Sequence, residues 1–364
     1  MDEVLAVADT PAALLMLDAL DGKELVRIPT GASFRARFKY PYVIVHRIDL
    51  HNVLLDACRK SAAIELVPQA MVTGFEDGGD NVSVSTADGR TLTGAALIAA
   101  DGLRSLFRQT LIGDGEPHPV GYAALRTIVP MGELKVDVPR DCVVLWGGPG
   151  YHVVHYPLRH GAEFNIVAVF RTTTHAEKAD AATYRAELEQ TYRSAHPSMR
   201  ELNAMMDLRW RRSVADRTPV RHWHKGNTVL LGDAAHAPLQ SLAQGACMAI
   251  EDGHCLAETT HVAERDFAAA FRRYEALRLT RTRACSSNPA RCGNRFIMST
   301  ALRGMCAMPP SPHGMKRIYL TVWRGSTTVP EREITSAANP KFARPRRAPM
   351  RTSASKAALQ SDTC

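Results

Sequence analysis

Residues 226–253, GNTVLLGDAAHAPLQSLAQGACMAIEDG, constrain the fold of this sequence more than any other segment. A short apolar run typical of a buried strand ends in Gly232 and Asp233. A loop follows, and a helical pattern begins at Gly245 and Ala246. This order brings backbone N–H groups and a carboxylate to a bound nucleotide, with the helix N-terminus facing an anion. The simpler alternative is an ordinary strand, loop and helix in which Asp233 only caps a helix.

The hydrophobic pattern changes along the chain from α/β to mostly sheet and back to α/β. A strand should feed a helix over residues 42–58, with Asp49 as the cap of its first turn. The predicted strands are 62–67, 81–86, 91–101, 122–129, 142–146, 151–158, 164–170 and 227–233. The predicted helices lie near 181–194, 245–258 and 265–284. The pattern suits a sheet-built domain inserted into a nucleotide-binding one.

Two shorter motifs precede the first segment in the chain. LIAADGLRSLFRQ ends a strand pattern in Asp101 and Gly102, and we expect two arginines on the following helix, Arg104 and Arg108. VIVHRIDLHNVLLDAC places Arg47 where a strand gives way to a helix. Each motif alone has an ordinary explanation, because Asp-Gly is a common turn and Arg47 could be a surface residue before a capped helix.

Together the three motifs resemble those of the FAD-dependent aromatic-ring hydroxylases, in the branch of the 3-hydroxybenzoate 6-hydroxylases and salicylate hydroxylases. The resemblance implies FAD as cofactor, NADH or NADPH as co-substrate, and O2 and a small phenolic acid as substrates. It favours conversion of 3-hydroxybenzoate to 2,5-dihydroxybenzoate, with a salicylate-type hydroxylation second. The residues that it places at the cofactor are Arg47, Asp101, Gly102, Gly232, Asp233, Gly245 and Ala246.

The resemblance also implies an α/β fold with α+β character. An incomplete Rossmann-like FAD-binding domain would carry an inserted, sheet-built substrate domain. The expected ranges are 1–118 and 223–300 for the FAD-binding domain, 119–222 for the substrate domain, 301–340 for a poorly defined C-terminal region and 341–364 for a basic disordered tail.

The strand YHVVHYPL, residues 151–158, carries the expected catalytic side chains. Because side chains alternate along a strand, His152 and Tyr156 should share one face, and His155 should lie on the other with a structural role. In the resembling family, a histidine and a tyrosine at this spacing contact the substrate phenol, and a glutamine matching Gln240 approaches from the other domain. Alternatively, both side chains are satisfied within the sheet.

Composition narrows the remaining classes. The formal net charge is +8, but much of it lies in the tail after residue 340, where KFARPRRAPMRTSASK has no acidic residue. A nucleic-acid or membrane-surface binder acting through this tail is the remote alternative, since such charge runs are usually solvated. Eight scattered cysteines form no zinc-type spacing, so no metal is expected. An acidic start and no long apolar run indicate a cytoplasmic protein, without nucleic-acid or membrane partners, for which a homodimer is conceivable.

The sequence departs from the family in two places. It lacks the early strand and G-x-G-x-x-G turn, as if it started roughly 60–70 residues into the pattern, on the scale of two βα units. That loss should leave a sheet edge and apolar helix faces exposed, and it admits a truncated, non-catalytic fragment as an alternative. The second departure is Ala237 between His236 and Pro238, where the family usually has proline directly after the histidine.

Overall fold

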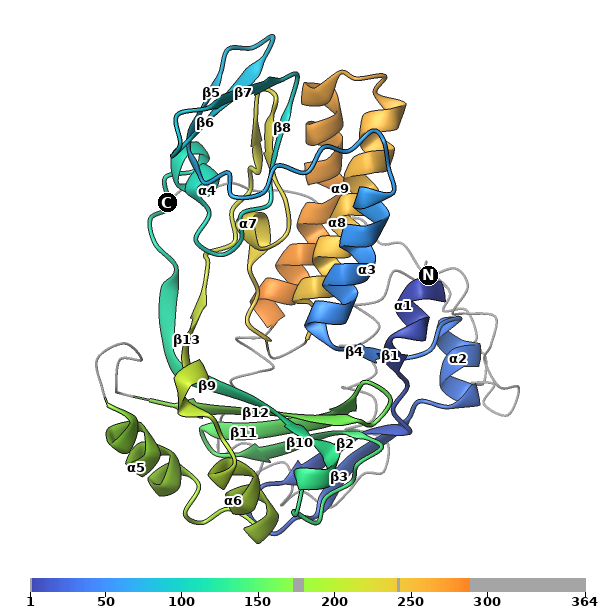
Figure 1. Cartoon of the computed structure of the whole chain (residues 1–364), viewed down its shortest axis with the longest axis vertical. Coiled ribbons are helices and arrows are strands. Elements are labelled where there is room, and N and C mark those ends of the chain that lie inside the picture. The colour runs from blue at the N-terminus through green and yellow to red at the C-terminus, as the bar shows by residue number, and fades with distance from the viewer. Residues whose placement is uncertain (1, 173–179, 241–242, 289–364) are drawn as a thin grey trace, which may run out of the picture. The chain divides into compact units, whose positions relative to one another are not determined.

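The structure is a computed structural model, and it describes residues 2–172, 180–240 and 243–288, with only the backbone for 284–288 (Figure 1). All of them belong to one compact unit, Met1–Ser326. The expected mixed α/β architecture is confirmed. The expectations for the C-terminal region and the basic tail fall outside the described residues.

A seven-stranded sheet carries the largest core. Its order is β13-β9-β12-β11-β10-β2-β3, antiparallel except for the β10–β2 pair. The strands are β2 (Ala13–Asp18), β3 (Glu24–Pro29), β9 (His118–Pro130), β10 (Val143–Gly148), β11 (Tyr151–Leu158), β12 (Glu163–Arg171) and β13 (Arg212–Asp216). The four strands predicted between residues 122 and 170 are all present, and two further strands join them from the first 30 residues.

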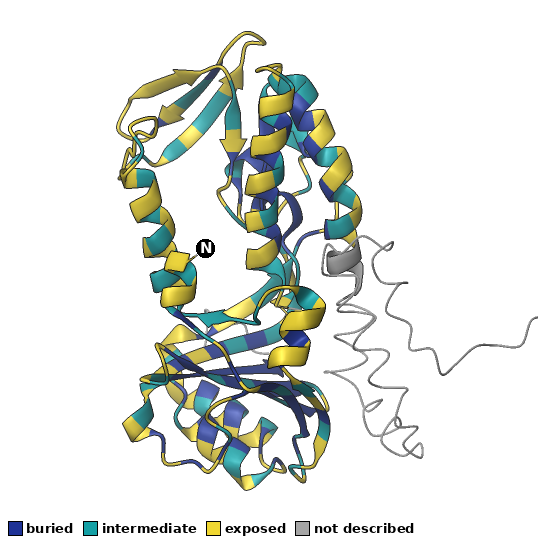
Figure 2. Cartoon of the chain, turned by 90° about the vertical axis from the view of Figure 1, so that its right-hand side faces the viewer, coloured by how far each residue is buried: buried dark blue, intermediate teal, exposed yellow. Residues whose placement is uncertain are grey.

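Two helices cover one face of this sheet, α5 (Ala181–Thr191) and α6 (Pro197–Ala204) (Figure 1). Val153 and Ile166 project from the strands toward Leu188 of α5 and Met199 of α6, and all four side chains are buried in one cluster. Removing such side chains from water is the main stabilising contribution of a core. The strands are correspondingly dominated by buried residues in Figure 2.

A smaller sheet, β14-β15-β8, forms a second core with two long helices. It consists of β14 (His224–Lys225), β15 (Thr228–Leu230) and β8 (Leu97–Ala99), and β15 and β8 are parallel. The helices are α8 (Gly245–Val262) and α9 (Phe267–Asn288), close to the predicted ranges. Beside them lie a three-stranded antiparallel sheet and a short helix: β5 (Val72–Asp77), β6 (Val82–Thr86), β7 (Thr91–Gly94) and α4 (Leu106–Leu111).

The remaining elements are short, apart from one helix. They are α1 (Asp2–Ala6), β1 (Ala8–Asp9), α2 (Ala32–Phe38), β4 (Ile44–Val45), α3 (Arg47–Arg59), the 3-10 turns η1 (Met131–Glu133) and η2 (Leu208–Trp210), and α7 (Asp233–His236). No helix in the described part of the chain is long and apolar enough to cross a membrane.

One edge strand and one helix outside the large sheet have exposed apolar side chains. Strand β8 is at an edge of its sheet, and Ile98 on it is 51% exposed. Helix α3 buries none of its residues, although Ile48 and Leu54 are apolar. Apolar side chains on β8 and α3 are therefore exposed. On the seven-stranded sheet, by contrast, α5 and α6 cover the apolar side chains of one face.

Three sequence predictions of local structure were wrong. Residues 62–67 form no strand; they are exposed, and the pairing with β6 is made by β5 instead. Asp49 does not cap α3, because His46 Nδ1 accepts the hydrogen bond from Ile48 N at 3.3 Å. Arg104 lies in the turn before α4 rather than on that helix, since α4 starts after its cap residue Ser105.

Candidate active site

The Asp-Gly and Gly-Asp motifs meet at one edge of the small sheet. Strand β8 runs toward Asp101 and Gly102, and its parallel neighbour β15 runs toward Gly232 and Asp233. A backbone hydrogen bond of 2.9 Å from Leu231 N to Ala99 O extends this pairing to the edge. The carboxyl ends of parallel strands form the crevice in which α/β folds bind nucleotides.

Helix α8 approaches this edge closely at two glycines. Gly232 has φ +61° and ψ −135°, and a Cβ on it would lie 3.2 Å from the Ala249 Cβ on α8. A Cβ on Gly245, the first residue of α8, would lie 3.9 Å from Asp233 Oδ1. Among the described residues no side chain caps α8, and Asp233 is exposed. These residues fit a dinucleotide, because the open helix N-terminus attracts an anion and the carboxylate can accept hydrogen bonds from sugar or ribityl hydroxyls.

The Asp101 motif is held in a defined turn. Gly102 has φ +81°, a backbone conformation that favours glycine. Asp101 Oδ2 accepts a hydrogen bond of 2.8 Å from Leu106 N, while the residue remains exposed. Its place at the edge therefore does not depend on a bound molecule.

Arg108 of α4 is a structural residue that fixes the loop after β15. Its fully buried guanidinium donates to the carbonyl oxygens of Ala235 at 2.8 Å and Thr218 at 2.8 Å, and it pairs with Asp114 at 2.6 Å. Arg217 adds a second buried cation to the same carboxylate at 3.3 Å. Burial alone would raise the pKa of Asp114, but these arginines keep it below its usual value.

A buried network that the sequence did not reveal holds the same loop from the other side. Asp252 of α8 accepts hydrogen bonds from His236 Nε2, from Gly232 N at 3.2 Å and from Arg278 Nε of α9 at 2.6 Å. Burial would raise the Asp252 pKa, yet His236 and Arg278 lower it. Gly232 and His236 are 20 and 16 residues from Asp252, and Arg278 is 26 residues from it on another helix, so no helical or strand spacing indicated the network.

Arg47 begins α3, and its neighbour Asp49 ties that helix to the substrate-side strand. Arg159, in the turn after β11, donates to Asp49 through Nε at 2.9 Å and Nη2 at 3.0 Å. This bidentate pair joins the start of α3 to the end of β11. Arg47 itself is exposed, so its guanidinium is accessible from solvent.

His152 and Tyr156 share one face of β11, as the alternation predicted. His152 pairs with Val169 of β12 and Tyr156 with Asn165, whereas Tyr151 and Val153 point into the core under α5 and α6. Burial lowers the pKa of His152 to about 4, and its Nδ1 has no hydrogen-bond partner among the described residues. The imidazole is therefore neutral at pH 7, with a buried ring nitrogen that makes no hydrogen bond within the described residues.

The remaining candidate residues, His155, Tyr156 and Gln240, have different surroundings. His155 lies on the opposite face, where its Nε2 accepts a hydrogen bond of 3.1 Å from Trp146 Nε1, which agrees with a structural role. Burial raises the pKa of Tyr156, against a smaller opposing effect of the Arg126 charge. Gln240 is exposed in the loop after α7, and its approach to a substrate stays a prediction.

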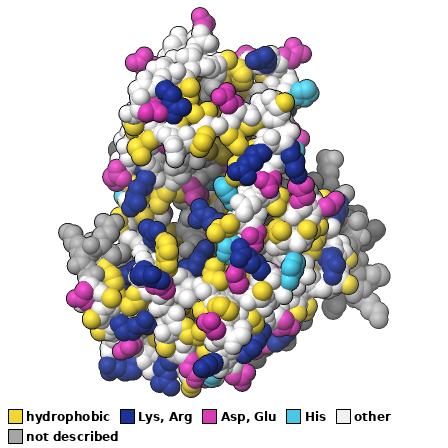
Figure 3. Space-filling model, in the orientation of Figure 1, with side chains coloured by type: hydrophobic (Ala, Val, Ile, Leu, Met, Phe, Trp, Pro, Cys, Tyr) yellow, Lys and Arg dark blue, Asp and Glu magenta, His cyan; other side chains and the backbone are white. Residues whose placement is uncertain are grey.

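Arg126 is a candidate site residue that was not predicted from the sequence. It lies on β9 between Leu125 and Thr127, which are buried. Its register partner is Val167 on β12, and this register puts Arg126 on the sheet face that carries His152 and Tyr156. The sequence did contain a sign of this position, because Arg126 is the one charged residue in the predicted strand YAALRTIV and alternates with residues that should be buried. On the face drawn in Figure 3, Lys and Arg side chains gather around a hollow. No group of metal ligands occurs among the described residues.

Comparison with known proteins gives this arrangement a context. Residues 18–285 match the FAD binding domain family. The chain is 37% identical over 272 residues to the 3-hydroxybenzoate 6-hydroxylase of Klebsiella oxytoca, covering 74% of this chain and 68% of the relative. It is 38% identical over 301 residues to 3-hydroxybenzoate 6-hydroxylase 2 of Aquipseudomonas alcaligenes, covering 82% of this chain and 89% of the relative.

Solved structures agree at the level of the fold. A salicylate hydroxylase in complex with its substrate superposes with a TM-score of 0.69 at 20% identity, over 90% of this chain and 86% of that one. Klebsiella pneumoniae HpxO, complexed with FAD and uric acid, gives a TM-score of 0.70 at 22% identity, over 92% of this chain and 81% of that one. The chain belongs to the FAD-dependent aromatic-ring hydroxylases, flavoprotein monooxygenases that use FAD together with NAD(P)H.

Proposed function

We propose that this protein hydroxylates 3-hydroxybenzoate to 2,5-dihydroxybenzoate, with NADH or NADPH and O2. The observation that carries the proposal is the position of His152 and Tyr156 on the same face of β11, with the His152 Nδ1 buried and without a partner among the described residues. Relatives that bear the name 3-hydroxybenzoate 6-hydroxylase at 37% and 38% identity support the choice of substrate.

In this proposal His152 accepts a hydrogen bond from the substrate phenol. With a pKa lowered to about 4 by burial, the imidazole does not deprotonate a phenol fully, since phenols titrate near pH 10. A hydrogen bond to its free nitrogen still draws the phenol proton away from the oxygen and raises the electron density ortho and para on the ring. Ring attack on an electron-rich position is favoured as a result.

Tyr156 and Arg126 position the substrate from the same face. The neutral hydroxyl of Tyr156 can donate to the phenol oxygen, because burial raises its pKa. Arg126 supplies a cation for the substrate carboxylate, to which a guanidinium binds in a bidentate manner. We assign Gln240 to the same pocket, from the opposite side, as the family resemblance implies.

The cofactor end of the site follows from the edge of the small sheet. Asp233 and Asp101 accept hydrogen bonds from hydroxyls of the cofactor, and the N-terminus of α8 at Gly245 and Ala246 stabilises negative charge near the ring system. Arg47 reaches toward the same group from the start of α3. When bound and reduced by NAD(P)H, FAD supplies the activated oxygen that is transferred to the substrate.

The test begins with an absorbance titration of the purified chain with FAD, followed by NADH and NADPH oxidation assays with product identification. We expect a bound-flavin spectrum and 2,5-dihydroxybenzoate from 3-hydroxybenzoate. Turnover of salicylate in preference to 3-hydroxybenzoate would move the proposal to a salicylate-type hydroxylase. A folded chain that binds no FAD would make it a non-catalytic fragment.

The role of His152 is tested by the variant His152→Ala. Loss of the phenol hydrogen bond should lower kcat by about 10²-fold, while FAD binding is unchanged. His254→Ala, at an exposed site on α8, is the matched control and should keep the parental rate. A His152→Ala protein with the parental kcat would contradict the assigned role.

A further inference from the structure

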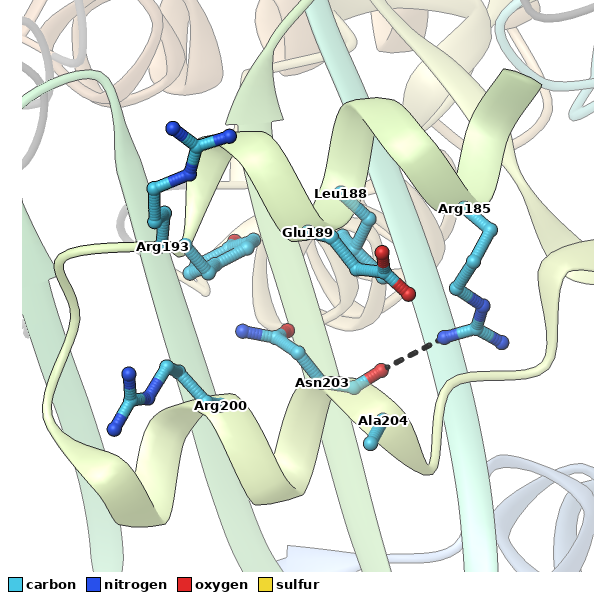
Figure 4. Close-up of a pocket in the computed structure, with 8 residues that line it drawn as sticks. Arg185, Leu188, Glu189, Arg193, Arg200, Asn203 and Ala204 are labelled. Carbon is cyan, nitrogen blue, oxygen red and sulfur yellow. Dashed lines mark hydrogen bonds between the residues drawn. The ribbon is translucent and has the colours of Figure 1, made fainter. Parts of the chain in front are cut away.

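A pocket of about 340 Å³ lies between α5 and α6, on the side of the seven-stranded sheet opposite to the His152 face (Figure 4). Its lining residues are Arg185, Leu188, Glu189, Tyr192, Arg193, Arg200, Asn203 and Ala204. Nothing in the proposed reaction uses these side chains. The volume is at the small end of the range of ligand sites, about 300–1,000 Å³, and it suits a compound of one ring.

The side chain of Asn203 is the strongest sign of a ligand. It is 4% exposed, it projects into the space between the two helices (Figure 4), and neither its Nδ2 nor its Oδ1 has a hydrogen-bond partner among the described residues. A buried amide without partners is costly, so such groups are normally satisfied by protein, water or ligand. The amide offers one acceptor and two donor positions to whatever occupies the pocket.

The charge around the pocket favours an anion. Arg185, Arg193 and Arg200 line it together with a single acid, Glu189. Arg185 is engaged in holding the end of α6, where it donates to Asn203 O at 3.2 Å and Met206 O at 3.0 Å. Arg193, just after α5, and Arg200 of α6 are exposed, and in Figure 4 both side chains point away from the space between the helices, so they must turn inward to bind a carboxylate there.

The wall behind the amide is apolar and lies directly behind the active-site strand. Leu188 and Tyr192 are buried, and Tyr192 presents an aromatic ring to the pocket. The Tyr192 hydroxyl donates to the backbone carbonyl oxygens of Val169 at 3.3 Å and His152 at 3.4 Å. The Tyr192 side chain therefore lies between the pocket and the backbone of His152.

We propose that the α5–α6 pocket is a second binding site for a small aromatic carboxylate. The ring packs on Leu188 and Tyr192, the carboxylate pairs with Arg193 and Arg200 at the opening, and the Asn203 amide bonds a polar substituent. Inorganic phosphate does not match this combination, because it has no apolar body to cover the buried wall.

The experiment is a titration of the full chain with 4-fluorobenzoate, followed by 19F NMR. The wild type is compared with Arg193→Gln/Arg200→Gln, with Asn203→Leu and with the active-site variant His152→Ala. Both arginines are exposed, so the double variant should fold, and urea unfolding checks each protein. Arg209→Gln, an exposed arginine outside the pocket, is the matched control.

We expect a class of bound probe, in addition to any at the active site, that persists in His152→Ala and Arg209→Gln. In the double variant its Kd should rise about tenfold, and Asn203→Leu should weaken it further if that protein folds. The proposal is overturned if the wild type binds no probe at millimolar concentration, which would leave water as the occupant. It is also overturned if all binding is lost in His152→Ala, or if inorganic phosphate displaces the probe at equal concentration.

Discussion

The two cores of this chain hold their buried histidines in different ways. The seven-stranded sheet buries His152, His155 and Asn165 without a charged partner, and burial lowers the pKa of both histidines. The small parallel sheet and its helices instead bury ions, among them Asp252 and Arg278, in hydrogen-bonded pairs. The buried histidines of the large sheet are thus neutral, whereas the buried histidine of the other core, His236, is paired with a carboxylate.

The difference between the two cores matches the groups that each core holds in place. Charged networks around Asp252 and Arg108 hold the loop after β15, whose backbone must stay in place to meet a cofactor. Buried charges need well-placed partners, so they fix one conformation of the groups that they join. The His152 face of β11 instead holds a neutral imidazole whose Nδ1 has no partner among the described residues, and in the proposed function this nitrogen accepts the hydrogen bond of a phenol.

Asp252→Ala should have the largest effect. It leaves the Arg278 guanidinium and His236 buried without their anion, and removing one partner of a buried ion pair costs about 3–5 kcal/mol. We expect that loss in the free energy of unfolding by urea, together with weaker FAD binding. The matched control is Glu258→Ala on the same helix, whose contact with His254 is exposed, and it should change stability by less than about 0.5 kcal/mol. Equal losses in the two variants would show that the network is not stabilising.

Lowering the pH should reduce the free energy of unfolding through the buried histidines of the seven-stranded sheet. The pKa of His152 is about 4 and that of His155 about 3 in the folded chain, both lowered by burial. The unfolded chain binds these protons near pH 6.5, so lowering the pH from 7 to 5 protonates only the unfolded state and removes about 2 kcal/mol of stability for each histidine. Asp252, whose pKa is lowered, loses its contribution only below about pH 4, so this window isolates the histidines.

The measurement is the urea midpoint at each pH, in the wild type and in His155→Gln. Glutamine can still accept the hydrogen bond from Trp146, so the variant removes the titration while it keeps an acceptor. We expect the stability of His155→Gln to fall with pH by about 2 kcal/mol less than that of the wild type. His254→Gln, at an exposed site, should follow the wild-type curve. An unchanged slope in His155→Gln would refute neutral burial at this position.

The sequence predicted the large sheet better than any other region, for a physical reason. Strand β11 and its neighbours are long and apolar, so their residue pattern is strong. The strands β2 and β3 were missed because β2 is stabilised by pairing with β10, more than 110 residues later in the chain, and β3 pairs in turn with β2. Residues 62–67 have a strand-like composition but find no partner, so propensity alone was misleading there.

The candidate site was predictable where it depends on local order. The period of two placed His152 and Tyr156 on one face. The resemblance assigned Asp101 and Asp233 to the cofactor, and the parallel pairing of β8 with β15 brings them to one edge. Asp252 was beyond sequence reasoning, because its partners come from separate elements. Its role depends on tertiary packing, which no spacing within the chain encodes.

Gly232→Ala, compared with Gly150→Ala, should have the smallest effect and separates backbone strain from crowding. Both glycines have positive φ, +61° and +78°, so alanine is strained at either site. A Cβ at 150, in the β10–β11 hairpin, meets nothing nearer than 3.9 Å, whereas at 232 it lies 3.2 Å from Ala249 Cβ. We expect Gly232→Ala to be less stable than Gly150→Ala by about 1 kcal/mol, since α8 must give way. It should also weaken FAD binding, because displacing α8 moves its N-terminus away from Asp233. Equal stability and equal FAD affinity in the two variants would mean that the close approach of α8 to this loop is not needed, and that the charged network alone holds the cofactor edge.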